Sequence, residues 1–126
     1  MGKVFIVEDN ALNLKLFCDL LAMKEHDVIV SRDGFNILET TLKERPDLIL
    51  MDIQLNSGVS GLDLIQELKN NQHTKHIPII AITAFAMRND EERISRTGCD
   101  MYLSKPVSIK KFFESIDIFI NPNNNA

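Results

Sequence analysis

The chain contains little cysteine and no long apolar run. Its 126 residues include two cysteines, Cys18 and Cys99, and no tryptophan. Two cysteines are too few for a disulfide framework and are typical of a reducing compartment. No apolar run approaches the ~18 residues that a membrane span requires. Residues 4–7 are apolar but are followed at once by Glu8 and Asp9, which is not the pattern of a secretory signal. We therefore expect a cytoplasmic protein with no membrane insertion.

An excess of basic charge is also missing. The chain has 14 lysines and arginines against 18 acidic residues, a net charge of −4. Nucleic-acid binding usually requires a basic face, so we expect no nucleic-acid partner. A hydrophobic content of 44% with 25% charged residues is typical of a globular chain of one domain. We expect that domain over residues 1–120, followed by a polar tail over residues 121–126.

Short apolar runs alternate with segments of helical periodicity along the chain. Strands are predicted over residues 3–7, 28–30, 47–52, 77–82 and 101–103, and helices over residues 11–24, 35–44, 62–70, 88–97 and 107–120. The third strand is a run of Leu, Ile and Met that ends on Asp52, which predicts burial on both faces. Five βα units without a hairpin signal predict an α/β fold, with a parallel sheet and helices on both faces.

Polar side chains follow four of the predicted strands. Glu8 and Asp9 follow the first, Asp52 the third, Thr83 the fourth and Lys105 the fifth. Parallel strands end at one edge of a sheet, so we expect these residues to converge. Three carboxylates in one pocket repel unless a cation intervenes, and oxygen ligands suit Mg²⁺. With a lysine to neutralise phosphoryl oxygens, the set predicts an aspartate that accepts a phosphoryl group.

Some of these residues also have a purely structural interpretation. Glu8 and Asp9, taken alone, could cap and charge the first turn of the helix that follows them. Thr83, taken alone, is a hydroxyl at the end of a strand. A structural role does not explain why three carboxylates and a lysine should meet, so the functional interpretation is preferred.

Four motifs together carry a resemblance to a known family. The sequences VEDN, LMD, ITA and SKP occur in this order at residues 7–10, 50–52, 82–84 and 104–106. In these motifs the chain resembles the receiver domains of two-component response regulators over nearly its whole length. The resemblance implies a flavodoxin-like, doubly wound sheet of five parallel strands in the order 2-1-3-4-5, with five helices on two faces.

The resemblance also implies a phosphoacceptor and a metal site. Asp52 would be phosphorylated by a histidine kinase or a histidine phosphotransfer protein. Mg²⁺ would be held by Asp9, Asp52 and the backbone carbonyl of Gln54, with Glu8 acting through a water molecule.

Residues of the last two strands would respond to the phosphoryl group. By the same resemblance, Thr83 and Lys105 would contact it, and the peptide bond between Lys105 and Pro106 is expected to be cis. Tyr102, the only tyrosine, stands where the family uses an aromatic switch that turns inward on phosphorylation. Simple packing of the strand is the alternative for Tyr102.

The chain departs from the family pattern in one loop. The family commonly places a proline between the phosphorylated aspartate and the glycine that begins the next helix. Here Asn56, Ser57 and Gly58 stand in that place, and Asp52 and Gly61 are one residue further apart than is common. We therefore expect a longer and looser loop beside the metal.

The first predicted helix has two apolar sides. Leu14 and Leu21 lie on one side, whereas Leu12, Leu16 and Met23 fall roughly opposite at ~100° per residue. The second side would be partly buried by the neighbouring last helix or would dock on the helical bundle of a kinase. The predicted docking residues are Asn10, Leu12, Asn13, Leu16 and Pro106.

The sequence favours a signalling protein, a monomer or weak dimer, whose output is contact with other proteins. Its only enzymatic activity would be self-catalysed phosphoryl acceptance and slow hydrolysis. Regulation of kinases and relay of the phosphoryl group to a histidine phosphotransfer protein both stay open. A phosphohydrolase of the haloacid-dehalogenase type is less favoured, because it requires a second acidic residue where Gln54 stands.

Overall fold

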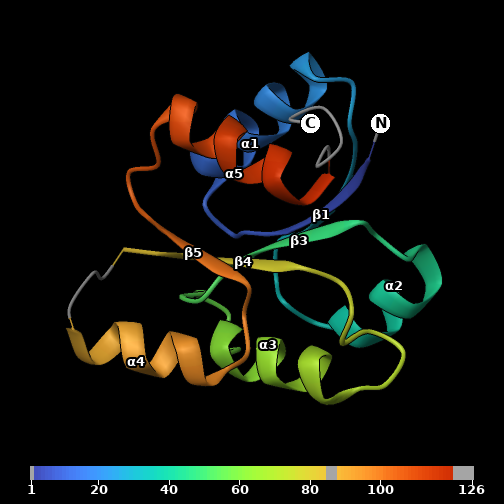
Figure 1. The fold of residues 1–126 in the computed structure, drawn as a ribbon, viewed down its shortest axis with the longest axis vertical. Helices are drawn as coiled ribbons and strands as arrows, with labels where there is room; N and C mark the ends of the chain where they lie inside the picture. Colours follow the sequence, from blue (N-terminus) through green and yellow to red (C-terminus); the bar gives the residue numbers. More distant parts are fainter. Residues whose placement is uncertain (1, 85–87, 121–126) are drawn as a thin grey trace.

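Five strands alternate with five helices in a computed structural model (Figure 1). It describes residues 2–84 and 88–120, with only the backbone of residues 88–90. The strands are β1 (Lys3–Val7), β2 (Asp27–Ser31), β3 (Leu48–Asp52), β4 (Ile79–Thr83) and β5 (Met101–Ser104). The helices are α1 (Ala11–Met23), α2 (Ile37–Glu44), α3 (Gly61–Asn70), α4 (Arg88–Arg96) and α5 (Ile109–Ile120). The predicted tail over residues 121–126 lies outside the described residues.

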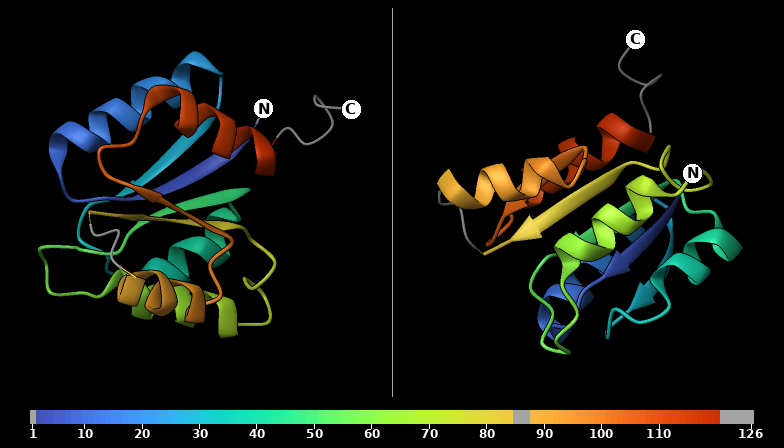
Figure 2. Two further views of the ribbon diagram at one scale, coloured as in Figure 1. Left: turned by 60° about the vertical axis from the view of Figure 1, so that its left-hand side comes forward. Right: turned by 90° about the horizontal axis from the view of Figure 1, so that it is seen from below.

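The strands form one parallel sheet in the order β2-β1-β3-β4-β5. Helices α1 and α5 cover one face of this sheet, and α2, α3 and α4 cover the other (Figures 1 and 2). The predicted fold class, strand order and two helical layers are therefore confirmed. Within the described residues, no helix is long and apolar enough to cross a membrane.

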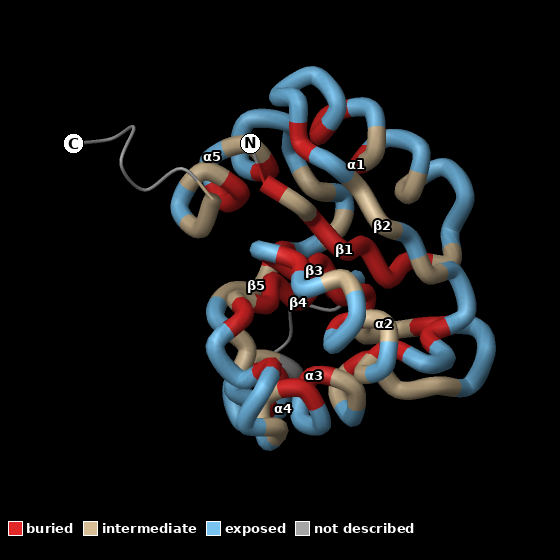
Figure 3. The backbone as a smooth tube through the Cα atoms, turned by 90° about the vertical axis from the view of Figure 1, so that its right-hand side faces the viewer, coloured by how far each residue is buried: buried red, intermediate tan, exposed pale blue. Residues whose placement is uncertain are grey.

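The core lies on both faces of the three central strands, which are the most buried part of the chain (Figure 3). All five residues of β3 are buried, as expected for a parallel strand covered on both sides. Alternate residues point to opposite faces, so Leu48 and Leu50 pack under α1 and α5, and Ile49 and Met51 pack over α2 and α3. This packing holds the end of β3, and with it Asp52, in a fixed place.

Several element boundaries differ from the predicted ones for local reasons. Helix α2 begins two residues later than predicted, because Asn36 adopts a left-handed conformation with φ of 57°. Helix α5 also begins two residues later, after the hydroxyl of Ser108 accepts a hydrogen bond from the N–H of Lys111 (3.1 Å). The prediction of β4 began two residues too early, at Ile77. None of these differences moves a residue of the predicted site.

Candidate functional site

Three carboxylates converge at the carboxyl edge of the sheet. Glu8 and Asp9 follow β1, and Asp52 ends the neighbouring strand β3, where Val7 and Met51 are paired in register. One carboxylate oxygen from each residue lies within 4.8 Å of the others. Glu8 and Asp52 are each only 1% exposed. The expected convergence is therefore observed, and most of its negative charge is buried.

Lys105 brings a single cation to this cluster from the end of β5. Its Nζ lies 2.9 Å from Asp52 Oδ2 and 3.5 Å from Glu8 Oε1. Burial by itself would lower the pKa of Lys105, but the hydrogen bond to Asp52 and the charges of Asp52 and Glu8 outweigh it and raise the pKa. Lys105 therefore stays protonated, yet one ammonium faces three carboxylates.

The excess of negative charge is reflected in the pKa of Glu8. Burial and the neighbouring Asp52 raise the pKa of Glu8 to about 7. Its Oε2 accepts a hydrogen bond from the N–H of Asn10 (3.1 Å), whereas its buried Oε1 accepts none among the described residues. A buried carboxylate oxygen without a donor is costly, and a divalent cation would satisfy it. The donor set therefore fits Mg²⁺, the metal that the sequence predicts.

The loop between β3 and α3 runs directly beside the cluster. The N–H of Gln54 donates to Asp52 Oδ1 (2.9 Å). The backbones of Gln54 and Ser60 pair in an antiparallel manner and so join the two ends of the loop. A Cβ on Gly61 would lie 2.4 Å from the backbone oxygen of Asp52, so only glycine allows α3 to start this close to β3. Leu55 is also buried in the core. These contacts fix both ends of the loop, and the looseness expected of its middle stays a prediction.

Thr83 and Tyr102 lie on the two neighbouring strands β4 and β5. Thr83 is fully buried at the end of β4, and its carbonyl accepts a hydrogen bond from the N–H of Lys105 (2.7 Å). The hydroxyl of Tyr102 donates to Glu91 Oε1 of α4 (2.7 Å), and this bond raises the pKa of Tyr102. Tyr102 is thus bound to α4. The sequence had no signal for Glu91, which is one of several acidic residues in that segment.

A cavity of about 480 Å³ separates α4, β5 and the start of α5. Tyr102 and Glu91 line it on one side, and Pro106 and Lys111 on the other. The bond between Lys105 and Pro106 is cis, as expected. A second cavity of about 540 Å³ lies at the opposite edge of the sheet, before β3 and β4, and none of the predicted site residues lines it.

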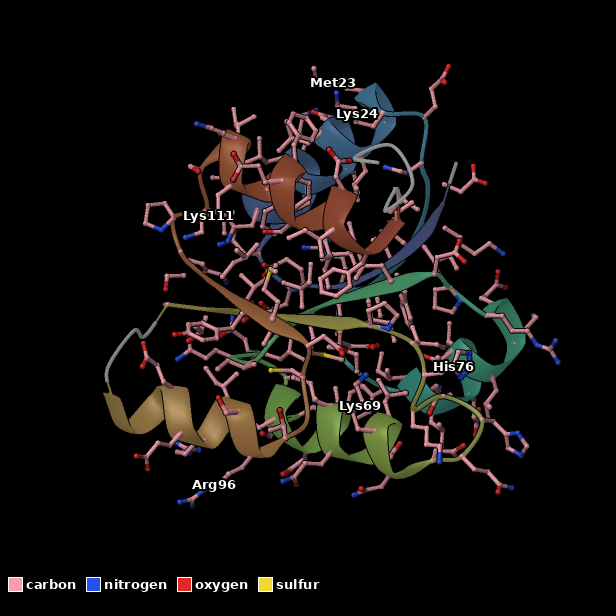
Figure 4. The ribbon with its side chains drawn as sticks, viewed as in Figure 1. Met23, Lys24, Lys69, His76, Arg96 and Lys111 are labelled. Carbon is pink, nitrogen blue, oxygen red and sulfur yellow. The ribbon has the colours of Figure 1, made fainter. Side chains whose placement is uncertain are left out.

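The predicted docking surface on α1 is exposed. Leu12 is 81% exposed, Leu16 39% and Met23 71%, and Met23 lies at the outer end of α1 (Figure 4). Helix α5 packs elsewhere on α1, where the rings of Phe17 and Phe112 stack 5.1 Å apart. The alternative of partial burial by the last helix is therefore wrong for Leu12 and Met23.

Asn10, Asn13 and Pro106 complete the predicted docking residues. Asn10 and Pro106 are exposed, and Asn13 is half-buried. The side chain of Asn10 caps α1 by accepting the N–H of Asn13 (3.0 Å), so Asn10 also has a structural role.

Comparison with known proteins places this geometry in a family. Residues 4–117 match the response regulator receiver domain. The chain is 50% identical over 117 residues to the polar-differentiation response regulators DivK of Brucella anthropi and Brucella ovis, covering 93% of this chain and 94% of each relative.

Two solved structures are similar as well. A receiver domain of a Pseudomonas aeruginosa sensor histidine kinase, with a magnesium ion in its active-site cleft, is 28% identical with a TM-score of 0.86, covering 95% of this chain and 98% of that one. The BeF3-activated receiver domain of Klebsiella pneumoniae RstA is 25% identical with a TM-score of 0.84, covering 93% and 97%. The chain belongs to the response regulator receiver domain family.

Proposed function

We propose that the protein is a phosphorylation-dependent signalling regulator of the DivK type, with Asp52 as its phosphoacceptor. The observation that carries this proposal is the position of Asp52. It ends a fully buried strand, lies 2.9 Å from Lys105 and shares its pocket with Glu8 and Asp9. The 50% identity to DivK over 93% of the chain supports the cell-cycle type of role.

A divalent cation belongs to this proposal. Asp9, Asp52 and the backbone carbonyl of Gln54 would hold Mg²⁺, and Glu8 would act through a water molecule. When bound, Mg²⁺ would neutralise charge on the phosphoryl oxygens. The raised pKa of Glu8 and its unsatisfied oxygen support the assignment, because both indicate a pocket with too little positive charge.

Phosphoryl transfer would form an O–P bond to the Asp52 carboxylate while the N–P bond to the donor histidine breaks. The released imidazole keeps the electron pair of that bond and takes a proton. Lys105 holds the Asp52 carboxylate in place by its charge and its hydrogen bond, and afterwards pairs with a phosphoryl oxygen. The Thr83 hydroxyl would donate to another phosphoryl oxygen.

The signal would leave through the surface around α4, β5 and α5. Movement of Thr83 and Lys105 toward the phosphoryl group would favour an inward position of Tyr102 and break its bond to Glu91. The 480 Å³ cavity that contains Tyr102 and Pro106 would change with it. If Tyr102→Ala, once phosphorylated, bound a partner as the wild type does, this route would be wrong.

The phosphoryl donor would dock on the exposed side of α1. Asn10, Leu12, Asn13, Leu16 and Pro106 would form that surface, which borders the edge where Asp52 lies. We expect Leu12→Asp to slow phosphorylation by a histidine-containing donor protein at least about ten-fold, because it places a charge in an apolar contact. The same variant should accept phosphate from acetyl phosphate normally, and Leu42→Asp on α2 is the matched control.

The partner would be a histidine kinase or a histidine phosphotransfer protein in the cytoplasm, where free thiols such as Cys18 and Cys99 persist. By likeness to the DivK relatives, we propose that the surface of this domain gives the output. We also propose that the protein is a monomer or weak dimer. We do not retain the haloacid-dehalogenase alternative, since the chain belongs to the receiver family.

Intact mass after incubation with acetyl phosphate and Mg²⁺ tests the central claim. We expect the wild type to gain one acid-labile phosphoryl group and Asp52→Asn to gain none. Lys105→Met and Asp9→Asn should slow the gain strongly, whereas Glu67→Gln on α3 should not. A phosphoryl group that persists in Asp52→Asn would overturn the assignment.

A further inference from the structure

Each of the three carboxylates of the site accepts a hydrogen bond from a backbone N–H on one of its two oxygens. Glu8 Oε2 accepts from Asn10 (3.1 Å) and Asp52 Oδ1 accepts from Gln54 (2.9 Å). In each case the other oxygen faces Lys105, at 3.5 Å and 2.9 Å. A bond of this kind fixes the rotamer of the carboxylate and decides which oxygen is presented to the pocket.

Asp9 obtains the same kind of bond from a distant segment. Its Oδ2 accepts from the N–H of Asn56, which lies 47 residues further along the chain, in the loop between β3 and α3. For Glu8 and Asp52 the donor is only two residues away and follows from local geometry. The orientation of Asp9 therefore depends on how that loop is held.

The loop is held by a second contact at the following residue. The hydroxyl of Ser57 donates to the backbone carbonyl of Asp33, in the loop between β2 and α2 (2.6 Å). Gly58 then has a positive φ of 89°, a conformation that residues with a side chain rarely adopt, so a glycine lets the chain turn here. Ser57 is thus a tether that sets the position of the N–H of Asn56.

We infer that the segment Asn56–Ser57 positions Asp9 for the divalent cation, with the N–H of Asn56 as the orienting donor and the hydroxyl of Ser57 as its support. This inference rests on the proposed function, in which Asp9 is a metal ligand. It concerns the place where the chain departs from the family pattern. A proline there has no N–H and could not donate to Asp9. The absence of that proline therefore allows the loop to supply an orienting bond.

The affinity for Mg²⁺ itself, measured by calorimetry without any phosphoryl donor, tests the inference. Loss of an orienting partner of a metal ligand typically weakens metal binding by about ten-fold or more. We expect that loss for Asn56→Pro, which removes the N–H, and no change for Asn56→Ala, which keeps it. Ser57→Ala should weaken binding several-fold, and Ser57→Thr, which keeps a hydroxyl, should restore it.

Thermal unfolding of each variant in metal-free buffer separates positioning from general damage. If Ser57 had only a structural role, its replacement would lower the melting temperature, but Ser57→Ala and Ser57→Thr would bind Mg²⁺ with the same affinity. If Asn56→Pro does not fold, the Ser57 pair decides. Mg²⁺ binding by both Asn56→Pro and Ser57→Ala that equals or exceeds the wild type would overturn the inference and leave the proposed function intact. A wild type that binds no Mg²⁺ would overturn both.

Discussion

The amino edge of the sheet, where the strands begin, and the carboxyl edge, where they end, use polar groups in opposite ways. At the amino edge, side-chain acceptors bind the first backbone N–H groups of neighbouring strands, as in Lys3 with Asp47 Oδ2 (2.8 Å) and Ile79 with Asp100 Oδ2 (2.8 Å). At the carboxyl edge, each carboxylate binds one N–H and keeps its other oxygen toward the pocket. The first arrangement joins strands, whereas the second keeps charge available for chemistry.

Lys69 at the amino edge and Lys105 at the carboxyl edge show the same contrast. At the amino edge, Lys69 of α3 (labelled in Figure 4) has three acceptors for its ammonium group. Its Nζ lies 2.8 Å from Asp100 Oδ2 and donates to the carbonyls of Lys75 and Ile77 at 3.2 and 2.8 Å, so that each of its three N–H groups has an acceptor. At the carboxyl edge, Lys105 is shared between Asp52 and Glu8 and leaves negative charge in excess. The fold is therefore stabilised at one edge and strained electrostatically at the other.

The largest effect is expected from breaking the amino edge. Lys69→Met should lower the free energy of unfolding by about 2 to 3 kcal/mol, because it leaves the carbonyls of Lys75 and Ile77 without their donor and removes the charge that pairs with Asp100. Mg²⁺ affinity should not change. Urea unfolding monitored by circular dichroism measures the loss, with the exposed Lys75→Met as control. A loss no larger than that of the control would mean that Lys69 contributes little.

An effect of opposite sign is expected at the carboxyl edge. Because the pKa of Glu8 is raised to about 7, the folded protein holds a proton that the unfolded chain releases above about pH 4.5. In metal-free buffer this group therefore lowers stability as the pH rises from about 4.5 to about 7, and the loss persists above that range.

Glu8→Gln removes this penalty. It should raise the free energy of unfolding by about 2 kcal/mol at about pH 8 and change it little near pH 4.5. Mg²⁺ should then stabilise the wild type more than the variant, since the variant has one negative charge fewer for the cation to neutralise. Urea titrations at the two pH values, with Glu67→Gln as control, measure both effects. Equal stability of variant and wild type at the higher pH would contradict the claim that the charge of Glu8 destabilises the carboxyl edge.

The smallest effect concerns His26 at the amino edge. Its Nδ1 accepts the N–H of Gly2 (3.1 Å), it is 6% exposed, and burial lowers its pKa. The unfolded chain therefore takes up a proton before the folded protein does, and stability falls as the pH drops below about 6.5.

His26→Gln should remove this dependence while keeping an acceptor for Gly2. Between about pH 7 and pH 5 the wild type should lose slightly more stability than the variant, because only the wild type has an imidazole whose pKa is lowered by folding. Thermal unfolding across that range measures it, with the exposed His73→Gln as control. The effect opposes that of Glu8 over the same range, so it is best measured in excess Mg²⁺.

Most of the fold and the convergence of the site were predictable from the sequence. The apolar run before Asp52 predicted β3, and the parallel order placed Asp52 beside Glu8, Asp9 and Lys105. The late start of α2 was not predictable, because it depends on the left-handed conformation of Asn36. The burial of His26 and the bond between Tyr102 and Glu91 were missed for a related reason, since both depend on packing between separate elements.

By itself, the sequence determined the alternation of strands and helices, the family and the identity of the residues at the strand ends. The elements and their end residues follow from local patterns, because the apolar period is encoded in neighbouring residues, and the family follows from four short motifs. Only the tertiary structure decided how the carboxylates are oriented and which side of α1 stays exposed. Backbone donors such as the N–H of Asn56 carry no side-chain signature, so their partners become known only when distant segments are placed together.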